Sequence, residues 1–176
     1  LIRRIPSYND FASRDLESIL GNDLESALHF QAVEFRTGIF FGDSKSEYAF
    51  SPLSNEVQQS PVNSILYHDF DRDGHKDLLV AGNNYMSEVE TTRSDAGIGS
   101  FLSGNGDGTF DYQLNIESGF FANQDVRNML VLSQNDLELI FIVNNESTHD
   151  LFKVNKSFLK NGLVPIKKAS KYIELK

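Results

Sequence analysis

Apolar and polar residues follow two different periods along this chain. Near the N-terminus the apolar positions recur at roughly helical spacing, as Phe11, Leu16, Ile19, Leu20 and Leu24. The pattern predicts a helix over 10–20 and a short second helix over 22–27. Ser7 or Asp10 can cap the first helix, and Gly21 can end it.

From residue 28 onward, short apolar runs alternate with polar, Gly-rich turns. Runs of this kind predict strands, which we place at 28–35, 38–41, 48–50, 64–68, 77–81, 98–102, 109–114, 127–132, 137–143, 149–154 and 163–167. Many short strands separated by such turns indicate a mainly β protein: a sandwich, a barrel or a propeller.

A weak internal repeat narrows this choice. Residues 39–50 and 100–110 each contain an apolar strand, a polar turn and an aromatic strand, about 60 residues apart. A four-stranded propeller blade is often about 40–50 residues long. The polar insertion at 83–97 accounts for the extra length, so the repeat favours a propeller.

The nonapeptide at 69–77 reads Asp-Phe-Asp-Arg-Asp-Gly-His-Lys-Asp and carries the clearest chemical signal. Alternating carboxylates with a glycine at the turn supply the hard oxygen ligands that Ca²⁺ requires. The expected ligands are the side chains of Asp69, Asp71, Asp73 and Asp77 and the backbone carbonyl of His75. An acidic, solvated β-turn that binds no metal is the alternative.

An EF-hand is excluded for this loop. An EF-hand requires a bidentate Glu at its twelfth position, and Val80 stands there. The segment beyond the loop also reads as a strand rather than as the second helix of an EF-hand.

The insertion at 83–97 is the candidate for ligand contact, because long loops on a rigid scaffold often carry binding residues. Tyr85, Met86, Arg93 and Asp95 are its candidate contact residues, since aromatic and Arg side chains are favoured at contact hot spots. An Arg93–Asp95 pair that only orders the loop is equally compatible with the sequence.

Asn105 and Asp107 either form a second metal site or, as we favour, are turn residues that adopt positive φ at low cost. The sequence has no nucleophile elbow and no phosphate-binding loop, and its four His residues form no close ligand pair. We therefore expect a protein that is not an enzyme.

Composition excludes several classes of function. The chain has 176 residues with a net charge of −9, which argues against nucleic acid as a partner. It has no cysteine, so disulfides and thiolate metal sites are excluded. No apolar run is long enough to predict a membrane-spanning helix. Because the chain begins at Leu1, we expect a piece of a longer protein.

Several segments resemble a known family. Residues 69–83 resemble the calcium loop and strand of FG-GAP/VCBS propeller repeats, and residues 104–110 resemble the hairpin that closes such a repeat. The segments 60–63, 93–99 and 117–121 are similar to the C-terminal region of large VCBS-repeat proteins of Bacteroidetes, related to the ASPIC/UnbV group. The likeness covers roughly residues 8–145.

The resemblance implies a mainly β fold: a partial, integrin-α-like β-propeller of about two and a half to three four-stranded blades, after a short N-terminal helical segment. The expected parts are a helical lead-in at 1–27, a degenerate blade at 28–62, the repeat blade with its calcium loop at 63–116, and a partial blade with a basic tail at 117–176. The remaining blades are expected from the same longer polypeptide.

The resemblance also implies a function. It predicts a calcium-stabilised, non-enzymatic module that binds a protein or a glycan, in a secreted or cell-surface bacterial protein. The alternative is an accessory or catalytic domain of a propeller-based polysaccharide-degrading enzyme, with Glu88 and Glu90 of the insertion as its candidate acids.

Overall fold

The computed structural model of this chain describes residues 5, 7–42, 44–45, 47–135, 137–155 and 163–165. The chain divides into two compact units, residues 1–35 and 36–176. Within the described residues, no helix is long and apolar enough to cross a membrane.

The first unit contains short helices: α1 (Tyr8–Ala12), α2 (Leu16–Leu20) and the 3-10 helix η1 (Gly21–Leu24). The single helix predicted over 10–20 is therefore two helices. The break arises because Asp15 is an N-cap, whose side chain accepts the N–H of Ser18 at 2.8 Å and starts a new helix. The second predicted helix is a 3-10 turn that ends at Leu24.

Residues 28–35 form no strand, so the strand predicted there is wrong. Their partial alternation of apolar residues is not matched by a partner strand. Leu28, Phe30, Val33 and Phe35 are instead exposed to solvent. Alternation alone does not make a strand, because the backbone also needs a neighbouring strand with which to form hydrogen bonds.

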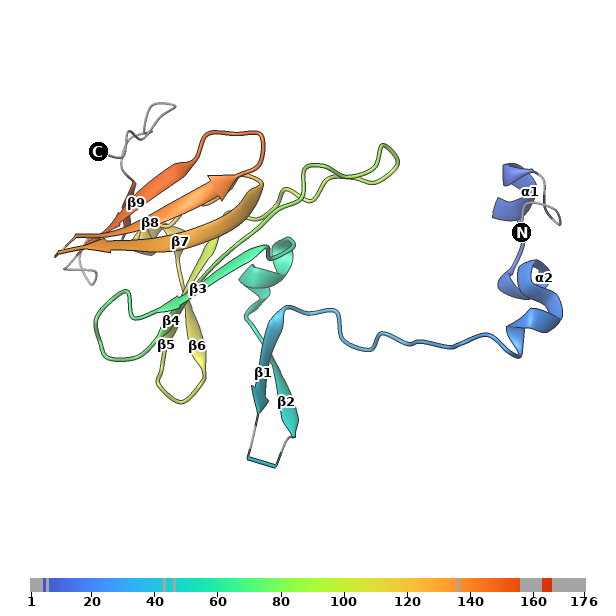
Figure 1. Cartoon of the computed structure of the whole chain (residues 1–176), viewed down its shortest axis with the longest axis horizontal. Coiled ribbons are helices and arrows are strands. Elements are labelled where there is room, and N and C mark those ends of the chain that lie inside the picture. Colours follow the sequence, from blue (N-terminus) through green and yellow to red (C-terminus); the bar gives the residue numbers. More distant parts are fainter. Residues whose placement is uncertain are drawn as a thin grey trace. The chain divides into compact units, whose positions relative to one another are not determined.

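The described residues of the second unit form three antiparallel sheets (Figure 1). The smallest pairs β1 (Gly38–Gly42) with β2 (Tyr48–Pro52) and is followed by η2 (Asn55–Gln59). The first four-stranded sheet has the order β3 (Ser64–His68), β4 (Asp77–Ala81), β5 (Ser100–Gly104), β6 (Phe110–Gln113). After α3 (Asn115–Ser118), the second has the order β10 (Leu163–Pro165), β9 (Asp150–Val154), β8 (Leu137–Asn144), β7 (Val126–Gln134).

The central strands β4 and β5 of the sheet β3–β6 are largely buried on both faces, and β4 shows why. Because successive side chains of a strand point to opposite faces, Leu79 and Ala81 enter one core while Leu78 and Val80 enter the other. The first core lies against the second four-stranded sheet and includes Phe70, Phe101, Phe120, Met129, Ile140, Ile142 and Phe152. The second contains Val57 and Leu102, with Ile39 and Leu53 packed against it.

The prediction of a mainly β fold is confirmed by these three sheets. The described residues form no closed propeller. Apart from 28–35, the predicted strands are present with bounds that differ by at most two residues. Examples are β5, which begins at Ser100 rather than at 98, and β7, which ends at Gln134 rather than at 132. Of the last predicted strand, 163–165 form β10, and residues 166–167 lie outside the described residues.

Candidate metal centre

The acidic nonapeptide connects β3 to β4. His68 at the end of β3 pairs with Asp77 at the start of β4, so the two ends of the loop are adjacent. Arg72 and Gly74 have φ values of 65° and 95°, in the left-handed region. This region is open to glycine and turns the chain sharply. The loop therefore folds back on itself and brings its first and last carboxylates together.

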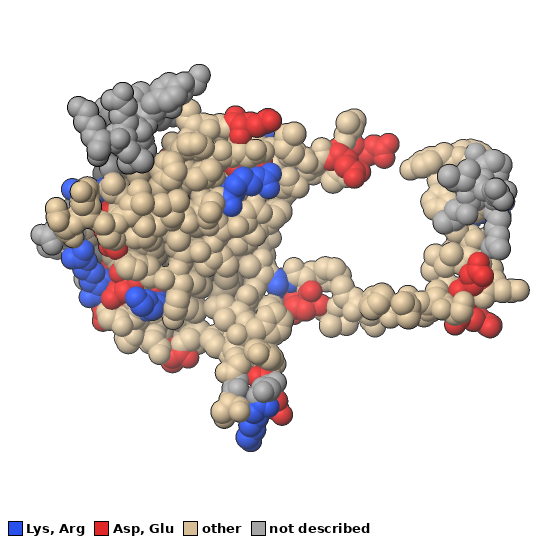
Figure 2. Space-filling model, in the orientation of Figure 1, with Lys and Arg blue, Asp and Glu red and all other residues tan. Residues whose placement is uncertain are grey.

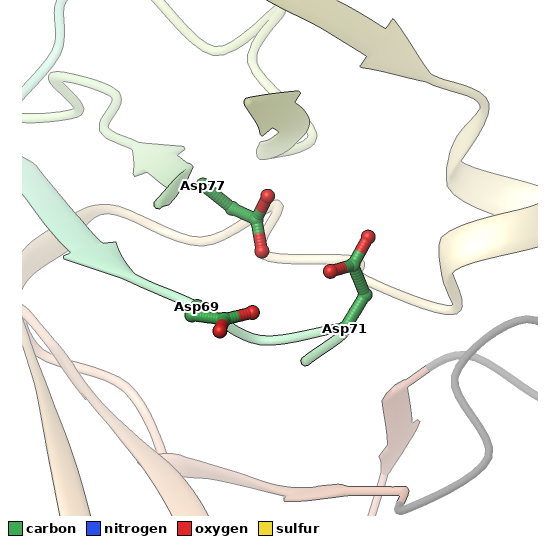
Figure 3. Close-up of side chains that lie close together, drawn as sticks. All are labelled: Asp69, Asp71 and Asp77. Atoms are coloured by element: carbon green, nitrogen blue, oxygen red, sulfur yellow. The ribbon is translucent and has the colours of Figure 1, made fainter. Parts of the chain in front are cut away.

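Asp69, Asp71 and Asp77 converge at this turn (Figure 3). Each offers a carboxylate oxygen, and these oxygens lie within 4.8 Å of one another. Among the described residues, this is the one group of three acidic, His or Cys side chains that is so arranged. Two oxygens bound to the same Ca²⁺ are at most about 5 Å apart, so the spacing suits this ion.

Asp77 is completely buried and oriented by the backbone. Its Oδ2 accepts the N–H of Phe70 at 2.8 Å, and its Oδ1 accepts the N–H of Gly104 at 3.0 Å. Burial raises the pKa of this carboxyl, although the hydrogen bonds from the backbone of Gly104, Phe70 and Asp71 act in the opposite direction. The side chain is thus held in place, but burial makes its ionised form energetically unfavourable.

Asp71 is also destabilised as an anion. Partial burial raises its pKa, and the negative charges of Asp77, Asp73 and Asp69 raise it further, against a hydrogen bond from the N–H of Asp73. Mutual repulsion among carboxylates is the condition that a bound cation relieves.

Asp69 adds an acceptor without a partner. Its Oδ2 accepts the N–H of Gly74 at 3.2 Å, but its Oδ1 is buried and has no hydrogen bond. A buried acceptor that is left unsatisfied is costly. The charge, the spacing and this unsatisfied oxygen all fit a hard cation ligated by oxygen, and Asp69, Asp71 and Asp77 would hold it.

Asp73 lies apart from this group, and of His75 it is the side chain, not the predicted carbonyl ligand, that has a described contact. The Asp73 side chain is exposed and accepts the N–H of His75 at 2.7 Å, and it is not part of the group of three. The imidazole of His75 packs on the β5–β6 turn, where a Cβ on Gly106 would lie 2.3 Å from its Nδ1. The structure thus brings together three of the four predicted carboxylates.

The insertion at 83–97 forms an arm whose base is ordered by its own residues. Arg93 lies over the ring of Tyr85, 4.8 Å from the centroid, and its Nε donates to Asp95 at 2.7 Å. The Tyr85 hydroxyl donates to the carbonyl of Asn123 at 2.8 Å. Three of the four predicted contact residues are therefore joined through Arg93, in the arrangement expected if the Arg93–Asp95 pair orders the loop.

The outer part of the arm carries the remaining candidates of the insertion. Met86 and Val89 are exposed, together with Glu88 and Glu90. Acidic side chains are visible on the arm in Figure 2. The backbone turns where the N–H of Thr91 donates to the carbonyl of Glu88 at 2.9 Å.

Asn105 and Asp107 occupy the β5–β6 turn and bond within it. Asp107 Oδ1 accepts the N–H of Thr109 at 2.9 Å, and Asn105 Nδ2 donates to Asp111 at 3.2 Å. The Thr109 hydrogen bonds lower the pKa of Asp107. These contacts are those of turn residues.

Sequence analysis missed the polar contacts that hold the site in the fold. His68, beside the acidic loop, bonds Glu138 of β8 through Nε2 at 2.6 Å. Asn83 is completely buried, and it binds both the N–H and the carbonyl of Gly97 to close the base of the arm. Both link segments distant in sequence, so no local pattern signals them.

Comparison of the chain with family models, with curated proteins and with solved structures found no match.

Proposed function

We propose that this chain is a calcium-stabilised, non-enzymatic β module. The observation that carries the proposal is the convergence of Asp69, Asp71 and Asp77, where one buried carboxylate oxygen has no hydrogen bond. Ca²⁺ accepts six to eight oxygens in a flexible shell, so three carboxylates and further carbonyl or water oxygens can complete the site. The role of the ion is structural, because it neutralises the repulsion within the loop.

The proposed role of the module is to bind a protein or a glycan on a secreted or cell-surface bacterial protein, as part of a larger propeller of the FG-GAP/VCBS kind. The resemblance of the acidic loop and of the strand that follows it supports this assignment. A partly exposed three-carboxylate site is suited to the calcium-rich cell exterior, where modules bind with dissociation constants of about 10⁻⁴–10⁻³ M.

The test is a calcium titration by calorimetry, with thermal melts in calcium and in chelator. We expect one site and a higher melting temperature in calcium. The ion stabilises the native state by RT ln(1 + [L]/Kd), about 2.7 kcal/mol at a hundredfold excess over Kd. Asp71→Asn removes one negative charge from the site and should weaken both effects. Glu88→Gln removes one negative charge on the arm instead and should retain them.

Two results would contradict the proposal. Absence of binding heat and of a thermal shift would leave the loop as an acidic turn. Equal calcium affinity in Asp71→Asn and Glu88→Gln would show that the ion binds elsewhere. Turnover in a polysaccharide-cleavage screen, lost in Glu88→Gln or Glu90→Gln, would instead support the enzymatic alternative.

A further inference from the structure

The β5–β6 turn, residues 105–109, lies between the acidic loop and the β1–β2 hairpin. On one side, a Cβ on Gly106 would lie 2.3 Å from Nδ1 of His75. On the other side, a Cβ on Gly108 would lie 2.8 Å from Cε1 of Phe41 in β1. Both distances are shorter than van der Waals contact, so a Cβ at either position would displace the neighbouring ring. The φ values of 78° at Gly106 and 91° at Gly108 also favour glycine.

The acidic loop also holds the turn through its backbone. The buried Asp77 carboxylate accepts the N–H of Gly104 at 3.0 Å, immediately before the turn. A Cβ on Gly104 would lie only 2.0 Å from the carbonyl oxygen of Lys76. One of the three carboxylates of the metal centre is thus bonded directly to the start of the turn.

The turn itself is braced from within. The N–H of Asn105 donates to the carbonyl of Thr109 at 3.0 Å, and Asp107 accepts the N–H of Thr109 at 2.9 Å. Because these bonds tie its first residue to its last, the turn is expected to move as a unit when the acidic loop moves.

The β1–β2 hairpin depends on such support. It is a sheet of two strands, and hairpins of this size are marginally stable by themselves. Its inner side contacts the protein through Ile39 and through Phe41 at the turn. Its other side carries Phe40 and Tyr48, which are 66% and 72% exposed, and the Phe40 ring lies 5.1 Å from that of Phe50.

We propose that a cation at Asp69, Asp71 and Asp77 stabilises the β1–β2 hairpin through the β5–β6 turn. In the loaded form the loop holds Gly104 and Gly106, and the turn holds Phe41. Without the cation, repulsion among the carboxylates loosens the loop and this support weakens. The aromatic surface of Phe40, Tyr48 and Phe50 is then held more firmly when the cation is bound. The inference rests on the proposed function.

The test measures amide hydrogen exchange of peptides covering residues 38–52 by mass spectrometry, in calcium and in chelator. We expect exchange in the wild-type protein to be about tenfold slower in calcium, within the usual range of coupling between sites. Phe41→Ala should lose this difference. The adjacent Phe40→Ala removes an exposed aromatic ring on the other side of the hairpin, and this variant should keep the difference.

Calorimetry on the same variants supplies a second reading. Because coupling is reciprocal, Phe41→Ala should weaken calcium binding by no more than the factor by which calcium slows hairpin exchange. Gly108→Ala perturbs the same contact from the turn and should reproduce the loss of the exchange difference if Phe41→Ala does not fold.

Three outcomes overturn the inference, and they are distinguishable. Calcium binding with unchanged exchange at 38–52 would refute the coupling and leave the proposed function intact. Absence of calcium binding would refute both. Equal loss of the exchange difference in Phe40→Ala and Phe41→Ala would show that the turn contact does not carry the effect.

Discussion

The carboxylate of Asp77, at the start of β4, accepts the backbone N–H of Gly104, at the end of β5, over 3.0 Å. Its other oxygen accepts the N–H of Phe70. This candidate metal ligand is therefore also a buried acceptor that joins the acidic loop to the next strand. Asp71 is a candidate ligand of the other kind, because partial burial and the neighbouring carboxylates raise its pKa and make its ionised form unfavourable.

In the presence of chelator, substitutions at Asp77 and Asp71 should distinguish a buried hydrogen-bond acceptor from a carboxylate that mainly adds repulsion. Asp77→Ala leaves two buried N–H groups without acceptors and should lower the free energy of unfolding by about 2–4 kcal/mol. Asp71→Asn removes a charge that its neighbours repel, so it should leave the free energy of unfolding unchanged or raise it. Urea unfolding with EGTA measures both, and Asp73→Asn, at an exposed position, is the control. A large loss in Asp71→Asn would contradict the assignment.

The stability of the calcium-free protein should depend on pH in a defined direction. The pKa of Asp71 and that of Asp77 are raised above the ordinary value of 3.8, so the folded state binds these protons more tightly than the unfolded state does. The stability that these two carboxyl groups contribute to the folded state is fully present below pH 3.8, and it is lost as the pH rises through their raised pKa values. Calcium should remove this loss, because it binds the ionised form.

The pH effect is isolated by comparing the wild-type protein with Asp71→Asn in chelator. The stability of the variant relative to wild type should increase as pH rises above about 4, since only the wild type ionises at this position. Unfolding midpoints in urea across a pH series give the difference. A relative stability that decreases with pH would show that the Asp71 pKa is lowered.

The core between the two four-stranded sheets should be sensitive to loss of volume. Phe120 is completely buried, and its ring centroid lies 5.5 Å from that of Phe152. Phe120→Ala should cost about 3–5 kcal/mol, the range for removing a buried aromatic side chain. Ile116→Ala, at an 84% exposed position in α3, should have little effect in the same chemical denaturation experiment. Similar losses in both would contradict the described packing.

The base of the 83–97 arm should depend on the Asn83 amide. Its Nδ2 donates to the carbonyl of Gly97 at 2.9 Å and to that of Gln124 at 3.1 Å. Asn83→Asp replaces this donor with a buried, repelled oxygen and should cost at least about 2 kcal/mol. Limited proteolysis should then cut the arm faster. Asn84→Asp is the control, since Asn84 bonds Ser94 through its backbone. Equal cleavage rates would refute the role of Asn83.

Much of the β structure was predictable because its signals are local. A short apolar run bounded by turn residues marks a strand such as β4 from its own residues, and the Gly-rich turn at 104–108 marks the β5–β6 hairpin. The strand predicted at 28–35 is wrong, because the alternating residues there have no partner strand. Prediction from the local pattern also failed at 10–20, where Asp15 caps a second helix within a continuous apolar pattern.

The sequence by itself determined the mainly β fold and the acidic loop, because strand period, turn glycines and carboxylate spacing are properties of neighbouring residues. Tertiary structure decided which carboxylates converge and which does not, as Asp73 faces solvent while Asp77 is buried between two strands. It also decided that Gly106 and Gly108 lie between His75 and Phe41. Burial and contact between distant segments depend on how the sheets pack, and no short stretch of sequence encodes that packing.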